Sequence, residues 1–183
     1  MARLPYLTKA DLKPEDHDVL SRDISLTKIL AHSPAAARAF SGLGMFIRHK
    51  SKLDARLREL AILQVGYLAR APYEWSHHVK IGYDFGVTDG DIAALIADTD
   101  GKPSALEPLA LAVVRGAREM VRDVSMSAAT FAELKKSLSA EHLTDLVVTI
   151  AFYCAVVRFL GTMEIDVEPD YLKYLEKYPL PNA

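Results

Sequence analysis

The chain has 183 residues, of which half are hydrophobic and a quarter are charged, which is the composition of an ordinary globular protein of one domain. Its 22 Lys and Arg residues nearly balance 24 Asp and Glu residues, and the formal net charge is −2. This balance excludes the binders of nucleic acid and of anionic membranes that depend on a basic excess. Cys154 is the only cysteine, which excludes an internal disulfide framework and a multi-cysteine metal knot.

The chain is expected to be cytoplasmic and to have no membrane partner. Its first 18 residues carry acidic side chains and lack the apolar stretch of a signal peptide. The longest strongly apolar run, 146–157, has twelve residues, whereas a membrane-spanning helix needs roughly 20. This run therefore predicts a core helix.

The hydrophobic pattern is helical almost throughout, because apolar residues recur at spacings of three and four. No stretch alternates with period two for long enough to predict a strand, so the predicted fold class is all-α. The predicted helices are 14–21, 24–31, 34–49, 54–70, 72–86, 88–98, 104–123, 127–137 and 141–165.

Local signals predict several helix ends. A Ser-x-x-Glu capping box over 104–107 and the Thr88–Asp91 pair predict helix starts. Gly86 predicts a helix end, since glycine adopts the left-handed conformation at little cost. Prolines within 166–183 mark a tail that leaves the last helix and either packs on a neighbour or stays loose.

The predicted helix 141–165 is apolar on nearly every side. Such a helix lies either at the centre of a large protein or under another subunit. We therefore expect a homo-oligomer, either a dimer, a trimer or a hexamer. The alternative is a helix at the centre of its own bundle.

Glu59 is the first candidate for chemistry. Its neighbours on one helix face are Ile62, Leu63 and Gly66. Apolar surroundings favour the protonated acid and are expected to raise the pKa of Glu59, which suits proton transfer near neutral pH. The alternative is a buried structural glutamate bonded to the backbone or to an arginine such as Arg56 or Arg58.

Glu74 and His78 are the second candidate, because their i, i+4 spacing brings them within hydrogen-bonding reach on one helix. A carboxylate that orients an imidazole fixes its tautomer for acid/base catalysis. The alternative is a half-buried histidine with satisfied nitrogens. His77 is expected to project outward.

No metal site is expected. Glu74-x-x-His77 matches half of a di-iron motif, but a bundle site of that type needs a second such pair, which the chain lacks. Phosphate-binding glycine loops and the Gly-x-Ser-x-Gly elbow are also missing from the sequence.

Three segments together resemble the carboxymuconolactone decarboxylase family, which includes the alkylhydroperoxidase D-like proteins. They are the Arg-x-Arg-Glu-Leu-Ala-Ile-Leu run at 56–63, Tyr-Glu-Trp-x-x-His at 73–78, and Gly-Val-Thr-Asp at 86–89 with Ile92. The resemblance implies an alkylhydroperoxidase D-like helical bundle that assembles into homo-oligomers. It also implies one domain over 1–183, in which 1–40 is an N-terminal extension and 166–183 a C-terminal tail.

The peroxidase branch of this family has a glutamate, a Cys-x-x-Cys pair and a histidine, and the resemblance aligns Glu59 and His78 with the first and last of these. The cysteine positions fall on Ala71 and Glu74, so both thiols are missing. A dithiol peroxidase cycle needs both. The resemblance therefore implies the decarboxylase branch, which uses neither a metal nor an organic cofactor.

We expect a cofactor-independent acid/base enzyme of lyase type that acts on a small lactone or carboxylate compound. Glu59 and His78 are the expected proton-transfer pair, and Glu74 is expected to orient His78. The expected substrate-binding residues are Tyr73, Trp75, Arg56, Arg58 and His77. The alternatives are an alkylhydroperoxidase-like antioxidant protein and a non-catalytic oligomeric binding protein.

Overall fold

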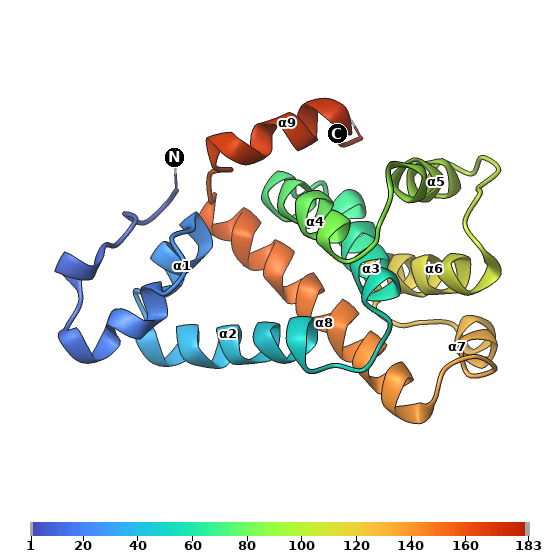
Figure 1. Cartoon of the computed structure of the whole chain (residues 1–183), viewed down its shortest axis with the longest axis horizontal. Coiled ribbons are helices and arrows are strands. Elements are labelled where there is room, and N and C mark those ends of the chain that lie inside the picture. The colour runs from blue at the N-terminus through green and yellow to red at the C-terminus, as the bar shows by residue number, and fades with distance from the viewer. Residues whose placement is uncertain (1, 182–183) are drawn as a thin grey trace.

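The structure is a computed structural model that describes residues 2–181. All regular secondary structure within this range is helical (Figure 1), which confirms the all-α prediction. Two 3₁₀ helices and nine α-helices are described: η1 (Lys9–Asp11), η2 (Pro14–Leu20), α1 (Ser25–Leu30), α2 (Pro34–His49), α3 (Ala55–Leu68), α4 (Pro72–Asp84), α5 (Asp89–Thr99), α6 (Pro108–Asp123), α7 (Ala128–Leu134), α8 (Ala140–Met163) and α9 (Pro169–Lys177).

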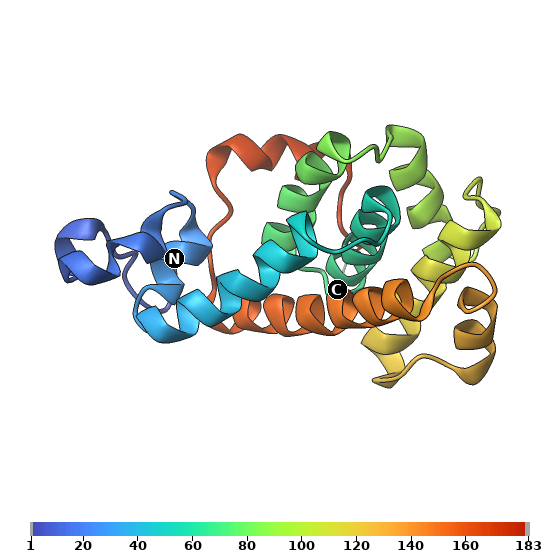
Figure 2. The ribbon, with the colours of Figure 1, turned by 60° about the horizontal axis from the view of Figure 1, so that its bottom comes forward.

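Helix α3 is the centre of the core and packs against α4, α6 and α8. Eleven of its residues are buried, from Leu57 to Tyr67 without a break, which explains why its sequence shows no polar face. Helix α8 runs across most of the molecule in both Figures 1 and 2 and joins the N-terminal side to the α6–α7 side. The core therefore fixes α3, α4 and α8 relative to one another.

Two predicted helix signals are confirmed. Gly86 has φ +89° after the end of α4, and the Val87 amide donates to the Gly82 carbonyl at 2.9 Å, as in a Schellman motif. The Thr88 hydroxyl and the Asp91 carboxylate cap the start of α5 in a reciprocal capping box.

The predicted start of a helix at residue 104 is wrong, because α6 begins at Pro108 with Glu107 as its N-cap. Proline suits the first helical position but disfavours helical geometry in the residue before it. Ser104 instead donates its hydroxyl proton to the Ala94 carbonyl at 2.9 Å. It therefore fastens the α5–α6 loop rather than capping α6.

The C-terminal tail forms a further helix, α9, which the sequence analysis missed. Helix α9 packs along α4, and the two lie side by side in Figure 1. Beyond it, the Tyr178 carbonyl accepts a hydrogen bond from the Trp75 indole at 2.8 Å. The tail is thus part of the fold around α4.

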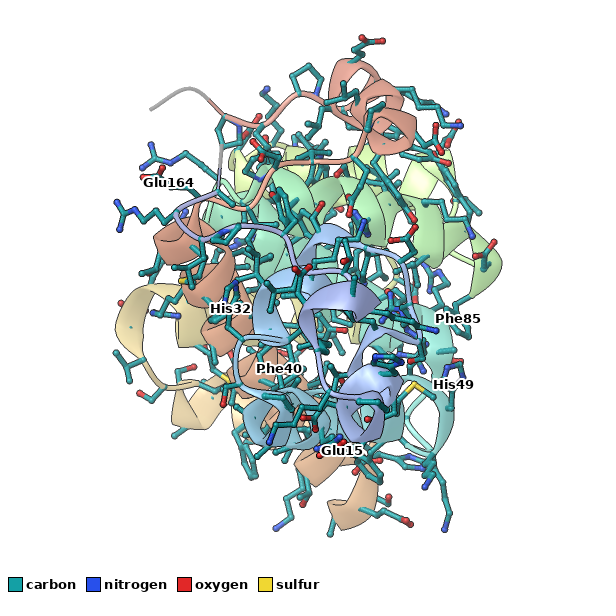
Figure 3. The ribbon with its side chains drawn as sticks, turned by 90° about the vertical axis from the view of Figure 1, so that its left-hand side faces the viewer. Glu15, His32, Phe40, His49, Phe85 and Glu164 are labelled. Carbon is teal, nitrogen blue, oxygen red and sulfur yellow. The ribbon has the colours of Figure 1, made fainter. Side chains whose placement is uncertain are left out.

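The N-terminal segment, residues 2–31, covers one end of the molecule and lies in front of α2 and α8 in Figure 3. Here η2 and α1 pack on α2 around a small separate core of Val19, Leu30, Ala31 and Ala37. This segment is tied to the C-terminal region, since the Arg3 amide donates to the Met163 carbonyl and the Ser25 amide donates to Glu168.

Within residues 2–181, α8 is the one helix long and apolar enough to span a membrane by length and composition, with a mean hydropathy of 1.9 over 18 residues. A core helix of a soluble protein has the same properties. Only 39% of that window is buried, and α2 also exposes Leu43, Met45 and Phe46. A second subunit on these faces stays a prediction.

Candidate active site

His78 lies between two carboxylates in the interior. Its Nδ1 is 2.6 Å from Glu59 Oε2 on α3, and its Nε2 is 2.9 Å from Glu74 Oε1 one turn earlier on α4. Glu59, Glu74 and His78 are 1%, 3% and 4% exposed, respectively. The fold thus brings together the three residues that the sequence analysis singled out as catalytic.

The pKa of Glu59 is lowered, and the expectation of a raised pKa is wrong. Burial alone raises this pKa, but the His78 cation and the Arg58 guanidinium outweigh burial. Arg58 Nε and Nη2 donate to Glu59 Oε1 at 3.1 and 3.0 Å. The apolar neighbours of Glu59 are present, yet two cations decide its ionisation, and the carboxyl is a carboxylate at neutral pH.

His78 is an imidazolium at neutral pH. Burial lowers the pKa of His78, but the carboxylates of Glu74 and Glu59 outweigh burial and raise it to about 9. Each ring nitrogen then carries a proton and faces one carboxylate. The Tyr153 ring meets the His78 ring edge-on, with 5.0 Å between centroids.

Of the two glutamates in this cluster, Glu74 is the one that lines a cavity. Its Oε1 is buried and lies 2.9 Å from His78 Nε2, and this contact is one of those that raise the pKa of His78. Glu74 lines a cavity together with His78, whereas Glu59 does not. The Glu74–His78 ion pair is therefore a buried pair at the cavity wall.

The cavity has a volume of about 310 Å³, the size of a site for a small molecule. Helices α4 and α8 form one part of its wall, and the N-terminal segment and α2 form the rest. Besides Glu74 and His78, its lining includes Tyr73, His77, Phe152, Tyr153, Phe40, Met45, Arg22, Arg38 and Arg48.

His77 is buried, and the expectation that it projects outward is wrong. Its ring is stacked between Tyr73 and Tyr171, with centroid distances of 4.1 and 3.6 Å. Its Nε2 is 2.7 Å from Glu168 Oε2, just before α9. The outward face of α4 at His77 is covered by the C-terminal helix, which sequence periodicity did not predict.

Glu168 joins three parts of the chain beside the cavity. It accepts hydrogen bonds from the Ser25 amide at 2.7 Å and from the Tyr73 hydroxyl at 3.1 Å. Burial raises the pKa of Glu168, but the hydrogen bonds from His77 and Ser25 outweigh burial and lower it to about 2. A fixed negative charge therefore holds α1, α4 and α9 together.

Three of the predicted substrate-binding residues lie outside the cavity. Trp75 is fully buried and donates to the tail. Arg56 pairs with Asp91 and Glu107 at 2.5 and 2.7 Å, and Arg58 is engaged by Glu59 and stacks on the Phe85 ring at 4.5 Å. Tyr73 and His77 do line the cavity.

The sequence analysis missed Arg22, Arg48, Tyr153 and Glu168. A signal existed for Arg48, because it follows Ala37, Ser41 and Gly44 at helical spacing on α2, and all four line the cavity. A charged residue at the end of a stripe of small residues indicates a polar site. Arg22 and Glu168 have no such signal, since tertiary packing alone brings Arg22 to the cavity and Glu168 to the lining residues Tyr73 and His77.

Cys154 lies outside this site. It borders a second hollow with Val65, Ala69 and Val121, and burial raises the pKa of its thiol. Among residues 2–181, no group of three or more His, Cys, Asp or Glu side chains has the arrangement of a metal site.

Residues 34–119 match the sequence model of the carboxymuconolactone decarboxylase family. No curated protein sequence matches the chain significantly.

Solved structures similar to this chain include the alkylhydroperoxidase AhpD core protein, an uncharacterized peroxidase-related protein from Ralstonia eutropha JMP134, at 20% identity and TM-score 0.78, covering 95% of each chain. A variant of the debrominase Bmp8 in complex with 2,3,4-tribromopyrrole has 18% identity and TM-score 0.78 over 97% of this chain and 99% of its own. A putative antioxidant defence protein AhpD from Agrobacterium tumefaciens has 17% identity and TM-score 0.67, over 76% of this chain and 95% of its own. At these identities the likeness shows a shared fold.

Proposed function

We propose that this protein is a cofactor-independent acid/base enzyme of lyase type that acts on a small lactone or carboxylate compound. Its residues 34–119 belong to the carboxymuconolactone decarboxylase family. One observation carries the proposal: a buried Glu59–His78–Glu74 relay ends at a cavity of about 310 Å³. Such a relay moves a proton without sulfur or metal.

Glu59 positions His78 rather than exchanging a proton with substrate. Its Oε2 accepts a hydrogen bond from protonated His78 Nδ1, 2.6 Å away, and its Oε1 accepts from Arg58. This carboxylate does not reach the cavity. Its negative charge fixes the ring orientation and favours the imidazolium, as a carboxylate partner does for other catalytic histidines.

Glu74 and His78 form the proton-transfer pair in this proposal, so the roles expected for Glu59 and Glu74 are exchanged. The transferable proton is the one on His78 Nε2, which lies 2.9 Å from Glu74 Oε1. Because Glu74 and His78 both line the cavity, this pair can pass a proton to a bound molecule. This geometry meets the requirement that a catalytic acid lie within reach of its substrate.

In a lactone acid, decarboxylation breaks the carbon–carbon bond to the carboxylate. The electron pair of that bond moves into the conjugated carbonyl system, and carbon dioxide leaves. A carbon of the resulting enolate then takes a proton from the His78–Glu74 pair, and His78 is left as a neutral imidazole. A proton from water restores the imidazolium, whose raised pKa of about 9 favours this return at neutral pH.

The alkylhydroperoxidase alternative has less support. Thiol peroxidase chemistry needs an accessible thiolate, whereas Cys154 has a raised pKa and borders a different hollow. The positions that the family resemblance assigns to the two thiols hold Ala71 and Glu74. A non-catalytic binding protein would use the cavity but would not need the relay.

Glu74→Gln tests the proposal. The purified protein is assayed for carbon dioxide release from a panel of small lactone acids and keto acids, and for peroxide consumption with a dithiol. We expect Glu74→Gln to lower turnover of the lactone acid by roughly 100-fold or more, and the matched control Cys154→Ala to retain it. Peroxide consumption that Cys154→Ala abolishes would overturn the proposal in favour of the peroxidase.

A further inference from the structure

Two arginines on the cavity wall have no acidic partner among the residues that the structure describes. Arg22 lies in the turn between η2 and α1, and Arg48 lies in the last turn of α2. Both line the cavity. Within residues 2–181, neither guanidinium has a carboxylate at ion-pair distance, and neither donates a hydrogen bond to the protein.

The other charged groups on this wall are neutralised by direct contacts. Arg38 pairs with Asp16 and Asp18 at 2.8 and 2.6 Å, and Glu74 pairs with His78. His77 pairs with Glu168. Among the described residues, Arg22 and Arg48 are therefore the cations of this wall that have no direct partner of opposite charge.

The two arginines lie close enough to repel each other. The pKa of Arg22 is lowered by burial and by the Arg48 cation, against the influence of Tyr73, Tyr153 and Tyr171. Two like charges in a partly enclosed space raise the energy of the empty site, and a bound anion lowers it. An arginine pair also offers two planar sets of donors, which match a carboxylate.

Local structure holds both residues in place. The Arg22 carbonyl accepts a hydrogen bond from the Thr27 hydroxyl at 2.6 Å, and the same hydroxyl lies 2.8 Å from the Ile24 carbonyl. Arg48 is held by the α2 backbone on the face that also presents Ser41 and Gly44 to the cavity. The backbone at both positions is thus fixed before any ligand binds, which reduces the entropy lost on binding.

We propose that Arg22 and Arg48 form a carboxylate-binding subsite, so that the ligand of this cavity is a compact organic acid held beside the Glu74–His78 pair. Turnover of the bound acid rests on the proposed function, whereas binding of the acid at the two arginines does not. Arg22 precedes the region that matches the family, residues 34–119, whereas Arg48 lies inside it. The N-terminal segment therefore adds a specificity element of this chain to the helical core.

Calorimetric titration of the full chain with succinate tests this subsite, with dimethyl succinate as an uncharged analogue and inorganic phosphate as a second anion. We expect succinate to bind and dimethyl succinate not to bind. Arg22→Gln and Arg48→Gln should each weaken succinate binding about tenfold or more. The matched control is Arg122→Gln, on the exposed surface of α6 and away from the cavity, which should bind succinate as the original protein does.

Two results would overturn the inference: unchanged succinate affinity in both arginine variants, or phosphate binding as tight as succinate binding. Arg22→Lys and Arg48→Lys keep the charge and guard against a folding defect, and partial recovery of affinity is expected. His78→Gln separates the two proposals, since it removes the transferable proton and leaves both guanidiniums. Succinate affinity within about threefold of the original in that variant supports the subsite whether or not any lactone acid is turned over.

Discussion

His77 and His78 are neighbours on α4 with opposite surroundings. His78 points into the core between two carboxylates and reaches the cavity beside Glu74. His77 is stacked between two tyrosine rings and bonded to Glu168 at the junction of both chain ends. The pair shows that one helix can supply a proton donor and an anchor for the cavity wall from adjacent residues, because their side chains diverge by about 100°.

The sharpest test of this contrast replaces each histidine by glutamine. We expect His78→Gln to lower turnover by roughly 100-fold to 10,000-fold, the range of general acid/base catalysis, with a helical protein of unchanged assembly. His77→Gln should retain most of kcat, because the transferable proton is on His78. Steady-state kinetics on the lactone acid, with circular dichroism, measure both, and equal losses of kcat would remove the distinction.

The second test removes the negative charge of Glu59, which pairs with His78 Nδ1. Glu59→Gln leaves Arg58 and His78 buried without their shared carboxylate, and breaking such a buried pair typically costs about 3–5 kcal/mol. Urea unfolding measures the loss of stability. A stability change below about 1 kcal/mol would show that the cluster is not held together by charge.

The third test uses pH. The pKa of His78 is about 9 in the folded chain and about 6.5 when unfolded, so its contribution to stability is fully present below pH 6.5 and is lost as pH rises through 9. The expected loss is on the order of 3 kcal/mol. Glu59, whose pKa is lowered, loses its contribution at acid pH instead. Urea unfolding at pH 6.5 and 9.5 measures the alkaline loss, and His78→Gln should flatten it.

The smallest expected effect concerns the anchor of His77. Glu168→Gln removes the fixed charge that joins Ser25, Tyr73 and His77, and we expect a loss of about 1–2 kcal/mol, since one partly exposed charged acceptor is replaced by a neutral one. A rise in KM with nearly constant kcat would place the effect on cavity shape. A loss confined to kcat would instead assign Glu168 to the reaction.

The sequence predicts the helical part of this site well and the rest poorly. Spacing alone brings Glu74 and His78 together, since i, i+4 residues meet on any helix. It did not predict the ionisation of Glu59, because side chains at i and i+1 do not face each other on a helix, yet Arg58 donates to Glu59. Periodicity reports which face is apolar but does not report such a pairing.

Contacts between segments far apart in the sequence explain the other features that the sequence did not predict. Helix α9 was not expected, because the prolines around it suggested an irregular tail, although Pro169 occupies the favoured first position of a helix. The covering of His77 and the arrival of Arg22 at the cavity depend on contacts between segments far apart in sequence. No local pattern encodes them.

The bond from the Ser25 amide to Glu168 spans 143 residues of sequence. During synthesis on the ribosome, Ser25 therefore emerges long before its partner does. The helices between them can begin to pack beforehand, as early-emerging parts of a chain generally do. Closure of the junction around Glu168 is consequently a late event of folding, and a nascent chain that has not yet reached this glutamate would leave the cavity open to the cellular milieu.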